Sequence, residues 1–370
     1  MRLATYNVEN LFSRARALNL PTWSEGGAIL NCYSEINKLF ENEVYSDADK
    51  ARMLELLTKL GLDKKDEGHF AILRKSRGDL IKRSIVGGTR VVATGRADWI
   101  GWVELKTEIV DEQATRNTAQ VVRDIGADVL AVCEAEGRSE LMQFNHVLLR
   151  QVGAESYEHV MLIDGNDERG IDVGLLTKPE YPIVWMRSHV DDKTDRGGLV
   201  FSRDCAEYLV WTPTGQRLWM LVNHFKSKGY GTQEASNERR KVQAARVRDI
   251  YSRLRGEGEK LIAVVGDLND SPDSDPLQPL FGETDLKDVS QLPAFADDGH
   301  PGTYHNGTAR EKIDYLMLSP ELAERMKAGG NWRKGVWGGK NGTRWEIYPE
   351  MRKEEHAASD HAAVWCDVDV

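Results

Sequence analysis

Hydrophobic and polar residues alternate in short runs over most of this chain. Seven runs of five to nine residues are rich in Val, Leu, Ile, Tyr or Trp and are bounded by polar turn residues, which predicts β-strands. They are RLATYNV at 2–8, DVLAVCE at 128–134, DVGLLTK at 172–178, YLVWT at 208–212, RLWMLVNHF at 217–225, KLIAVVGDL at 260–268 and KIDYLMLS at 312–319. Helices are predicted between some of them, at 118–125 before Gly126 and at 232–254 before Gly256.

Residues 14–113 differ from this pattern. A helix is predicted at 47–60, and a basic segment with a GGT turn and the strand-like TRVVATG follows it. This block could be a separate small domain, but strands that belong to one core lie on both sides of it. We therefore expect a single catalytic domain over 1–370 with an insertion at 14–113.

Composition is typical of a globular protein, with 41% hydrophobic and 29% charged residues among 370. No apolar run is long enough for a membrane span, Met1-Arg2 leads straight into a strand without a signal peptide, and the four cysteines match no zinc or disulfide spacing. We expect a cytoplasmic protein. Its net charge of −10 argues against binding of nucleic acid through overall electrostatic attraction. Residues 72–96 and 237–255 are locally basic and could override this, and solvated helix faces are the alternative interpretation of both segments.

Polar groups with catalytic potential follow several of the predicted strands. In GDLND, a buried strand ends in Gly266, and the turn after it presents the side chains of Asp267 and Asn269. Asp267 could accept a proton from water, and Asn269 could bind a metal or a phosphate oxygen. An ordinary Asx turn explains the same residues equally well.

An acid–histidine pair is expected near the end of the chain. KIDYLML places Asp314 inside an apolar strand, where a buried carboxylate needs a partner, and SDHAAVW supplies His361. An Asp–His pair fixes the tautomer and raises the basicity of the ring. Asp360 beside it can ligate a metal. The alternatives are a surface Asp on an edge strand and a Ser-Asp turn.

Basic and acidic residues at other strand ends are candidates for contact with a phosphate. VNHFKSKG ends a strand with His224 and then Lys226, and RGIDVGLL begins one with Arg169 and Asp172. Arg169 could clamp a phosphate in bidentate fashion, and Asp172 could orient Arg169 or His224. A structural histidine and a turn salt bridge are the alternatives.

Asn7 in YNVEN and Glu134 in CEAE offer hard oxygen ligands after apolar strands. Magnesium prefers a few oxygen ligands and keeps several waters, so one amide and one or two carboxylates suffice. Glu9 and Glu136 are close alternatives. Strand alternation puts Glu134 and Glu136 on one face, so the sequence does not choose between them.

The order of these motifs resembles the endonuclease/exonuclease/phosphatase superfamily over residues 1–12 and 114–370. The resemblance implies an α+β fold, a four-layered α/β/β/α sandwich with the site at one end of two packed sheets. It implies metal-site positions at Asn7, Glu134 and Asp360. It implies catalytic positions at His224, Asp267, Asn269, Asp314 and His361. The wording NHFKSKG is most similar to bacterial nucleases of the superfamily.

Two segments depart from the family pattern. The insertion separates Asn7 from Glu134 by 134 − 7 = 127 residues, and 360 − 314 = 46 residues separate Asp314 from Asp360. The second segment, GGNWRKGVWGGKNGTRW, interleaves Trp337 and two further tryptophans with Arg and Lys. Such a pattern suits base stacking and phosphate contact, and a self-packed lid is the alternative.

We expect from these residues a Mg²⁺- or Mn²⁺-dependent phosphodiesterase, most readily a nuclease acting on DNA in preference to RNA. A phosphoesterase acting on an inositol phosphate, a nucleotide or a sphingomyelin-type lipid is the alternative with the same chemistry. A catalytically idle binding module is the alternative of another class. A protein partner for the 14–113 insertion is a further expectation, while endo or exo action, the number of metal ions and the oligomeric state stay open.

Overall fold

The computed structural model describes residues 1–20, 23–84, 86–167, 169–228 and 232–370. These residues form two compact units, one made of 1–12, 110–228 and 232–370 and the other of 13–109. The second unit lies close to the bounds of the expected insertion at 14–113. That it is an insertion into one catalytic domain stays a prediction.

The first unit contains two mixed six-stranded sheets. In spatial order, one sheet consists of β17 (Met326–Trp332), β18 (Ala363–Val368), β1 (Arg2–Asn7), β8 (Val129–Ala135), β10 (Asp172–Thr177) and β9 (His159–Ile163). The other consists of β11 (Ile183–Arg187), β12 (Cys205–Trp211), β13 (Arg217–His224), β14 (Leu261–Asp267), β16 (Asp314–Leu318) and β15 (Lys287–Asp288). All seven predicted strands are present.

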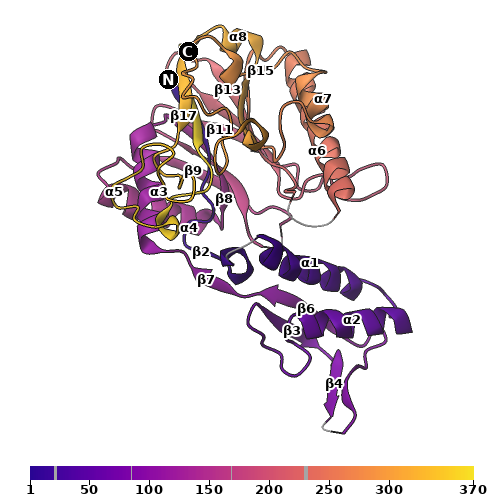
Figure 1. Ribbon diagram of the computed structural model, residues 1–370. Helices are drawn as coiled ribbons and strands as arrows, with labels where there is room; N and C mark the ends of the chain where they lie inside the picture. Colours follow the sequence, from indigo (N-terminus) through magenta and orange to yellow (C-terminus); the bar gives the residue numbers. More distant parts are fainter. Residues whose placement is uncertain (21–22, 85, 168, 229–231) are drawn as a thin grey trace. The chain divides into compact units, whose positions relative to one another are not determined.

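Alternation along the strands produces the layers. Leu3 of β1 and Ala263 of β14 belong to one buried core between the sheets, whereas Ala4 and Ile262, their neighbours, face the outer cores. Helices α3 (Glu112–Ile125) and α4 (Arg138–Gln143) cover the first sheet. Helices α6 (Gln233–Gly256) and α7 (Gln278–Phe281) cover the second (Figure 1). The expected α+β, four-layered α/β/β/α sandwich is therefore confirmed.

Local signals fix the ends of the long helices. Gly126 caps α3 in the left-handed conformation, with φ 60°, as its place after the apolar stripe predicts. The side chain of Thr232 accepts the N–H of Ala235 at the start of α6. Helix α6 continues to Gly256, so the glycine expected to follow the helix is its last residue. The remaining short helical segments are α5 (Leu149–Gln151), α8 (Pro320–Ala323), a π-helical segment at Phe144–Leu148, and 3-10 helices at Arg16–Asn19, Asp275–Leu277, Val289–Gln291, Ala309–Glu311 and Glu354–His356.

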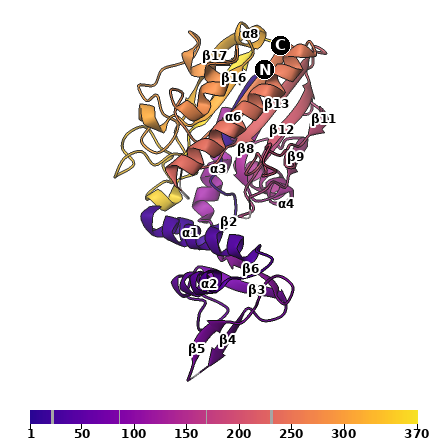
Figure 2. The same cartoon turned by 90° about the vertical axis from the view of Figure 1, so that its right-hand side faces the viewer.

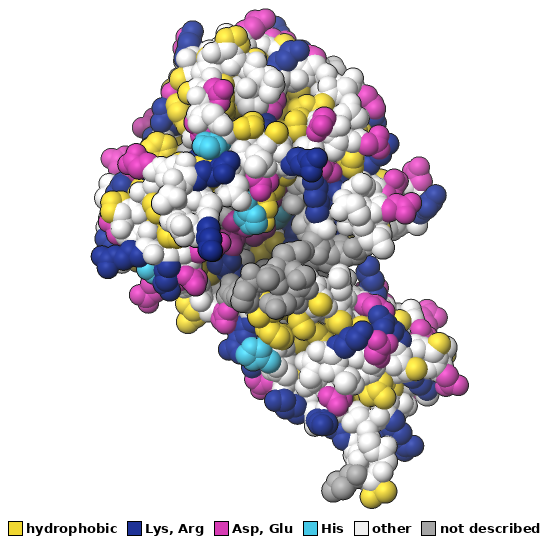
Figure 3. Space-filling model, viewed as in Figure 1, with side chains coloured by type: hydrophobic (Ala, Val, Ile, Leu, Met, Phe, Trp, Pro, Cys, Tyr) yellow, Lys and Arg dark blue, Asp and Glu magenta, His cyan; other side chains and the backbone are white. Residues whose placement is uncertain are grey.

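The second unit has a core of its own. Helix α2 (Asp47–Lys59) begins with a capping box between Ser46 and Asp49 and buries its apolar stripe. It packs with α1 (Trp23–Phe40) on strands β3 (Ala71–Arg77) and β6 (Ile100–Leu105). Figure 2 shows the hairpin of β4 (Ile81–Ser84) and β5 (Gly88–Val91) next to them, and Figure 3 shows basic side chains beside it. Strands β2 (Ser13–Ala15) and β7 (Thr107–Ile109) pair at the ends of this unit.

No helix in the described ranges is long and apolar enough to cross a lipid bilayer.

Gly266 is the residue on which the GDLND turn depends. Its φ is +124°, and a Cβ added there would lie 1.9 Å from the carbonyl oxygen of Asn223 on the neighbouring strand. We predict that Gly266→Ala lowers the free energy of unfolding by about 3 kcal/mol because strain and overlap add. Gly215→Ala is the control: φ is +76° with nothing within 4 Å, so the loss is about 1 kcal/mol. Equal losses in urea unfolding would contradict this account.

Candidate active site

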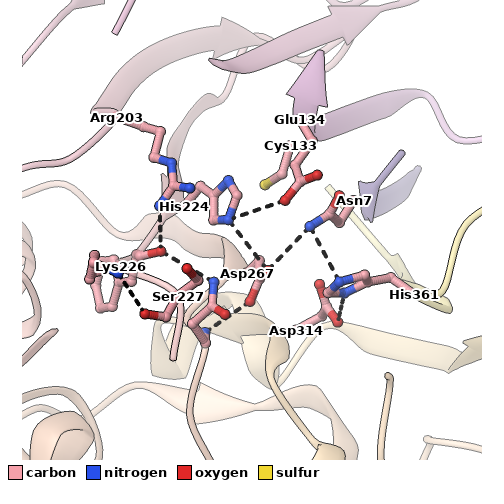
Figure 4. A network of polar contacts seen from close by, with 12 residues as sticks. Asn7, Cys133, Glu134, Arg203, His224, Lys226, Ser227, Asp267, Asp314 and His361 are labelled. Atoms are coloured by element: carbon pink, nitrogen blue, oxygen red, sulfur yellow. Dashed lines mark hydrogen bonds and ion pairs between the residues drawn. The ribbon is translucent and has the colours of Figure 1, made fainter. Parts of the chain in front are cut away.

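Four of the expected residues meet where strands of the two sheets end. β13 runs parallel to β14 with His224 opposite Asp267, and β16 runs antiparallel to β14 with Asp314 opposite Asp267. The three side chains therefore form a row on the face that looks toward the other sheet. Asn7, the last residue of β1 in that sheet, places its Nδ2 3.2 Å from Oδ2 of Asp267 (Figure 4).

Asp267 lies at the centre of this row and is 2% exposed. Its Oδ1 accepts the N–H of Asn269 at 2.8 Å. Burial first, and then the carboxylates of Asp314 and Glu134, raise the pKa of Asp267 to about 7, although His361 and the N–H of Asn269 oppose this rise. A carboxylate with this pKa can accept a proton from water near neutral pH.

His361 and Asp314 form a buried pair. Nδ1 of His361 lies 2.8 Å from Oδ2 of Asp314, which also accepts a hydrogen bond from the hydroxyl of Thr303. Burial disfavours the charged ring, but Asp314, Asp360 and Asp267 outweigh it and hold the pKa of His361 well above its usual value. His361 is therefore the positively charged histidine of the site.

His224 lies on the other side of Asp267 and is neutral, unlike His361. Its Nε2 is 3.5 Å from Oδ2 of Asp267 and 3.7 Å from Oε1 of Glu134. Burial, with the nearby Arg203 and Arg169, holds the pKa of His224 well below its usual value. Two histidines around one carboxylate thus differ in charge because of their surroundings.

Glu134 reaches the site through a β-bulge. β10 pairs Asp172 with Ala135 but Val173 with Cys133, which leaves Glu134 as the extra residue, with φ 66°. The expectation that strand alternation puts Glu134 and Glu136 on one face was wrong for this reason. Glu136 instead accepts the backbone N–H groups of Leu11 and Phe12 at 3.0 and 2.8 Å.

Cationic side chains line the edge of the site beside His224. Arg169 forms a bidentate pair with Asp167, and Nε of Arg203 lies 2.8 Å from the same carboxylate. Sequence reasoning offered Asp172 as the partner of Arg169 and did not identify Asp167 or Arg203. Asp172 accepts the N–H of Gly165 at 2.8 Å, and burial raises its pKa to about 7.

Lys226 and Asn269 complete this edge. Burial, followed by Arg203 and Arg169, lowers the pKa of Lys226 to about 7, and its Nζ donates to the carbonyl of Ser227 at 2.9 Å. The amide of Asn269 donates to the carbonyl of Phe225 at 3.2 Å from a backbone with φ 55°.

Strained backbone is concentrated around the site. Among the described residues, the non-glycine residues with positive φ are Glu9, Asn10, Glu134, Asn269 and His305. Each occupies a turn or bulge beside the strand ends already described, in a conformation that costs roughly 1–3 kcal/mol. His305 was not identified from the sequence; it stacks on Tyr304, and its Nε2 lies 3.7 Å from Oδ2 of Asp360.

Trp337 lies in the long segment between Asp314 and Asp360. It is half-buried, packs against the outer core under α3 and touches Gly342 of its own segment. Trp345 likewise donates to the carbonyl of Val336 at 2.9 Å. The tryptophans of this segment thus pack on their own chain, and contact of Trp337 with a substrate stays a prediction.

The residues expected to hold a metal fit a hard divalent cation. Oδ1 of Asp360 is buried without a hydrogen-bond partner among the described residues, and Glu134 adds a second carboxylate. With the amide oxygen of Asn7 they would supply an all-oxygen donor set of the kind Mg²⁺ and Mn²⁺ prefer, and this assignment stays a prediction. A second candidate set is Asp267, Asp314 and His361, whose ligand atoms lie within 4.8 Å of one another. In that set Oδ2 of Asp314 and Nδ1 of His361 already bind each other.

Comparisons with known proteins agree with this fold and site. The profile of the endonuclease/exonuclease/phosphatase family matches residues 94–322, and the chain belongs to this family. It is a hydrolase that acts on phosphoester bonds, with a buried cluster of acids and histidine. No curated protein matches the chain.

Solved structures share the fold at low sequence identity. A mannosyl-6-phosphatase of Bacteroides thetaiotaomicron is 15% identical with a TM-score of 0.50, covering 70% of this chain and 92% of its own. An endonuclease/exonuclease/phosphatase of Bacteroides vulgatus is 16% identical with a TM-score of 0.50, covering 70% and 91%.

The two glutamates provide a matched test of the site. We predict that Glu134→Gln lowers metal-dependent hydrolysis of bis(p-nitrophenyl) phosphate by about 100-fold with little change in stability, because it removes a site carboxylate. Glu136→Gln should instead lower the free energy of unfolding by about 2 kcal/mol, because its charge-assisted bonds to Leu11 and Phe12 weaken. A loss of activity in Glu136→Gln with a loss of stability in Glu134→Gln would show instead that Glu136 is the site carboxylate.

Proposed function

We propose that this protein is a metal-dependent phosphodiesterase that cleaves nucleic acid, DNA in preference to RNA. The observation that carries the proposal is Asp267, a buried carboxylate with a pKa of about 7, between a charged and a neutral histidine. This arrangement provides a base for water and two different groups for a phosphate, as an in-line displacement requires.

Asn7, Glu134 and Asp360 would hold the cation, with Mg²⁺ or Mn²⁺ as the expected ions and the cytoplasm as the expected compartment. When bound, the ion would supply positive charge to a scissile phosphate. Asp267 accepts the proton of the attacking water through the carboxylate that also binds Asn7. Asn269, fixed by its bond to Phe225, positions that water or a phosphate oxygen.

The two histidines act on the phosphate in different ways. His361 carries the positive charge that Asp314 holds in place and stabilises charge that develops on a phosphoryl oxygen. His224 is neutral, and its Nε2 faces two carboxylates, so that nitrogen carries the proton. Lys226 and Arg169 at the same edge offer further donors to non-bridging oxygens.

A second candidate is a phosphatase that acts on a small phosphorylated molecule. The guanidinium groups of Arg169 and Arg203 share the carboxylate of Asp167, and the amine of Lys226 lies at the same edge of the site. A phosphomonoester carries more negative charge than a diester and suits such an edge. The mannosyl-6-phosphatase of Bacteroides thetaiotaomicron shares the fold.

Cleavage assays separate these candidates. Labelled circular single-stranded DNA, circular duplex DNA, RNA and mannose 6-phosphate are incubated with Mg²⁺ or Mn²⁺, with EDTA as the control. We predict metal-dependent cutting of circular DNA, which Asp267→Asn lowers at least about 1,000-fold because it removes the base.

Asp204→Asn is the matched control for that substitution. Asp204 is also a buried carboxylate whose pKa burial raises, but it accepts the N–H of His189, a bond that asparagine can keep. Activity of this variant should equal that of the wild type. Hydrolysis of mannose 6-phosphate alone would replace the nuclease by the phosphatase, and full activity of Asp267→Asn would reject the proposed base.

A further inference from the structure

The hairpin of β4 and β5 in the second unit is fixed on one face. The guanidinium of Arg83 donates to the carbonyl of Leu62 at 2.9 Å and to Oδ1 of Asp66 at 2.7 Å. On the next strand, the hydroxyl of Thr89 donates to the carbonyl of Asp63 at 2.8 Å. These bonds hold the hairpin against the 62–66 loop, so its position within the second unit is defined.

The other face of the hairpin carries two cations in direct opposition. Lys82 and Arg90 are cross-strand partners, and both are exposed. Like charges directly opposite each other in an antiparallel pair destabilise it. We call Lys82 and Arg90 the hairpin surface.

The two cations of the hairpin surface form no ion pair among the described residues. Asp66 in the 62–66 loop pairs with Arg83, which lies on the opposite face of the hairpin. Helix α6, the other basic segment, shows the contrast: Lys241, Arg248 and Arg255 pair with Asp275, Glu283 and Glu321. The basic character expected at 237–255 is therefore largely cancelled, whereas that of the hairpin surface is not.

Charge is also segregated along the sequence. Residues 64–96 hold nine Lys or Arg and three Asp or Glu, a net charge of 9 − 3 = +6 in a chain of net charge −10. A local cationic surface raises the local concentration of a polyanion even on a protein that is acidic overall. The exposed Val86 near the hairpin turn adds an apolar contact, at 98% exposure.

We propose that the hairpin surface binds the phosphate backbone of duplex DNA. A two-stranded β-ribbon fits the major groove, and cations on a ribbon reach phosphates on either side of it. DNA also relieves the repulsion between Lys82 and Arg90, because backbone phosphates lie between such cations. This inference rests on the proposed nuclease function and assigns its substrate contact to the second unit.

Binding in EDTA tests the surface apart from cleavage. Full-length protein and fluorescein-labelled duplex DNA are titrated by fluorescence anisotropy at several salt concentrations. Lys82→Gln with Arg90→Gln should weaken binding about 10-fold and reduce the slope of log K against log salt by about 2, one for each lost phosphate contact. The control removes one exposed and one partly buried cation from the helices of the same unit, Lys38→Gln with Lys50→Gln, and should leave both quantities unchanged.

Hydrolysis of bis(p-nitrophenyl) phosphate, which needs no extended contact, should be the same in both double variants. Unchanged DNA binding by Lys82→Gln with Arg90→Gln would overturn the inference, as would binding to phosphatidylserine vesicles in place of DNA. Hairpin-dependent DNA binding without any cleavage would leave the inference standing and remove the proposed nuclease function. Cleavage of DNA together with DNA binding that the hairpin variant leaves unchanged would support the proposed nuclease function and reject the inference.

Discussion

The burial of Asp267 between two β-sheets is the constraint on which the rest of the site depends. A carboxylate in an apolar interior is costly unless its neighbours compensate for its lost hydration. Here the neighbours are the N–H of Asn269, the amide of Asn7 and two imidazoles, each from a different strand or turn. The same burial that makes Asp267 costly raises its pKa into the range where a base is useful.

The fold provides these neighbours through strand pairing. Because β13, β14 and β16 are adjacent and in register, His224, Asp267 and Asp314 follow one another across the sheet. Local exceptions to regular β structure then complete the set. The bulge at Glu134 turns a carboxylate inward, and Gly266 lets β14 approach β13 more closely than any side chain would allow. The stability of the β-sandwich therefore offsets the cost of the strained backbone at the site.

Much of this could be predicted from the sequence, because alternation and strand-end polar residues are local signals. The seven strands and the residues in the central row follow from them, whereas the four layers were expected from the resemblance to the family. The bulge at Glu134 does not, since an extra residue in a ladder depends on the partner strand β10. Asp167, Arg203 and His305 were missed for a similar reason. Asp167 lies two residues before Arg169, a spacing that could have signalled the pair, but Arg203 meets them only through the fold.

The second unit shows the limit of sequence reasoning in another way. Its helix α2 and its basic segment were recognised, but only the structure separates cations paired with acids from those that are not. Composition alone treats Lys241 and Lys82 alike, although one contacts Asp275 and the other faces an arginine.

The position of a bound Mn²⁺ ion in a crystal, located by its anomalous scattering, tests the central claim most directly. The account predicts one ion bound by Glu134 and Asp360 with Asn7 beside it, and an intact contact between Asp314 and His361. An ion bound instead by Asp267, Asp314 and His361 would contradict the account, because it would occupy the proposed base and its histidine.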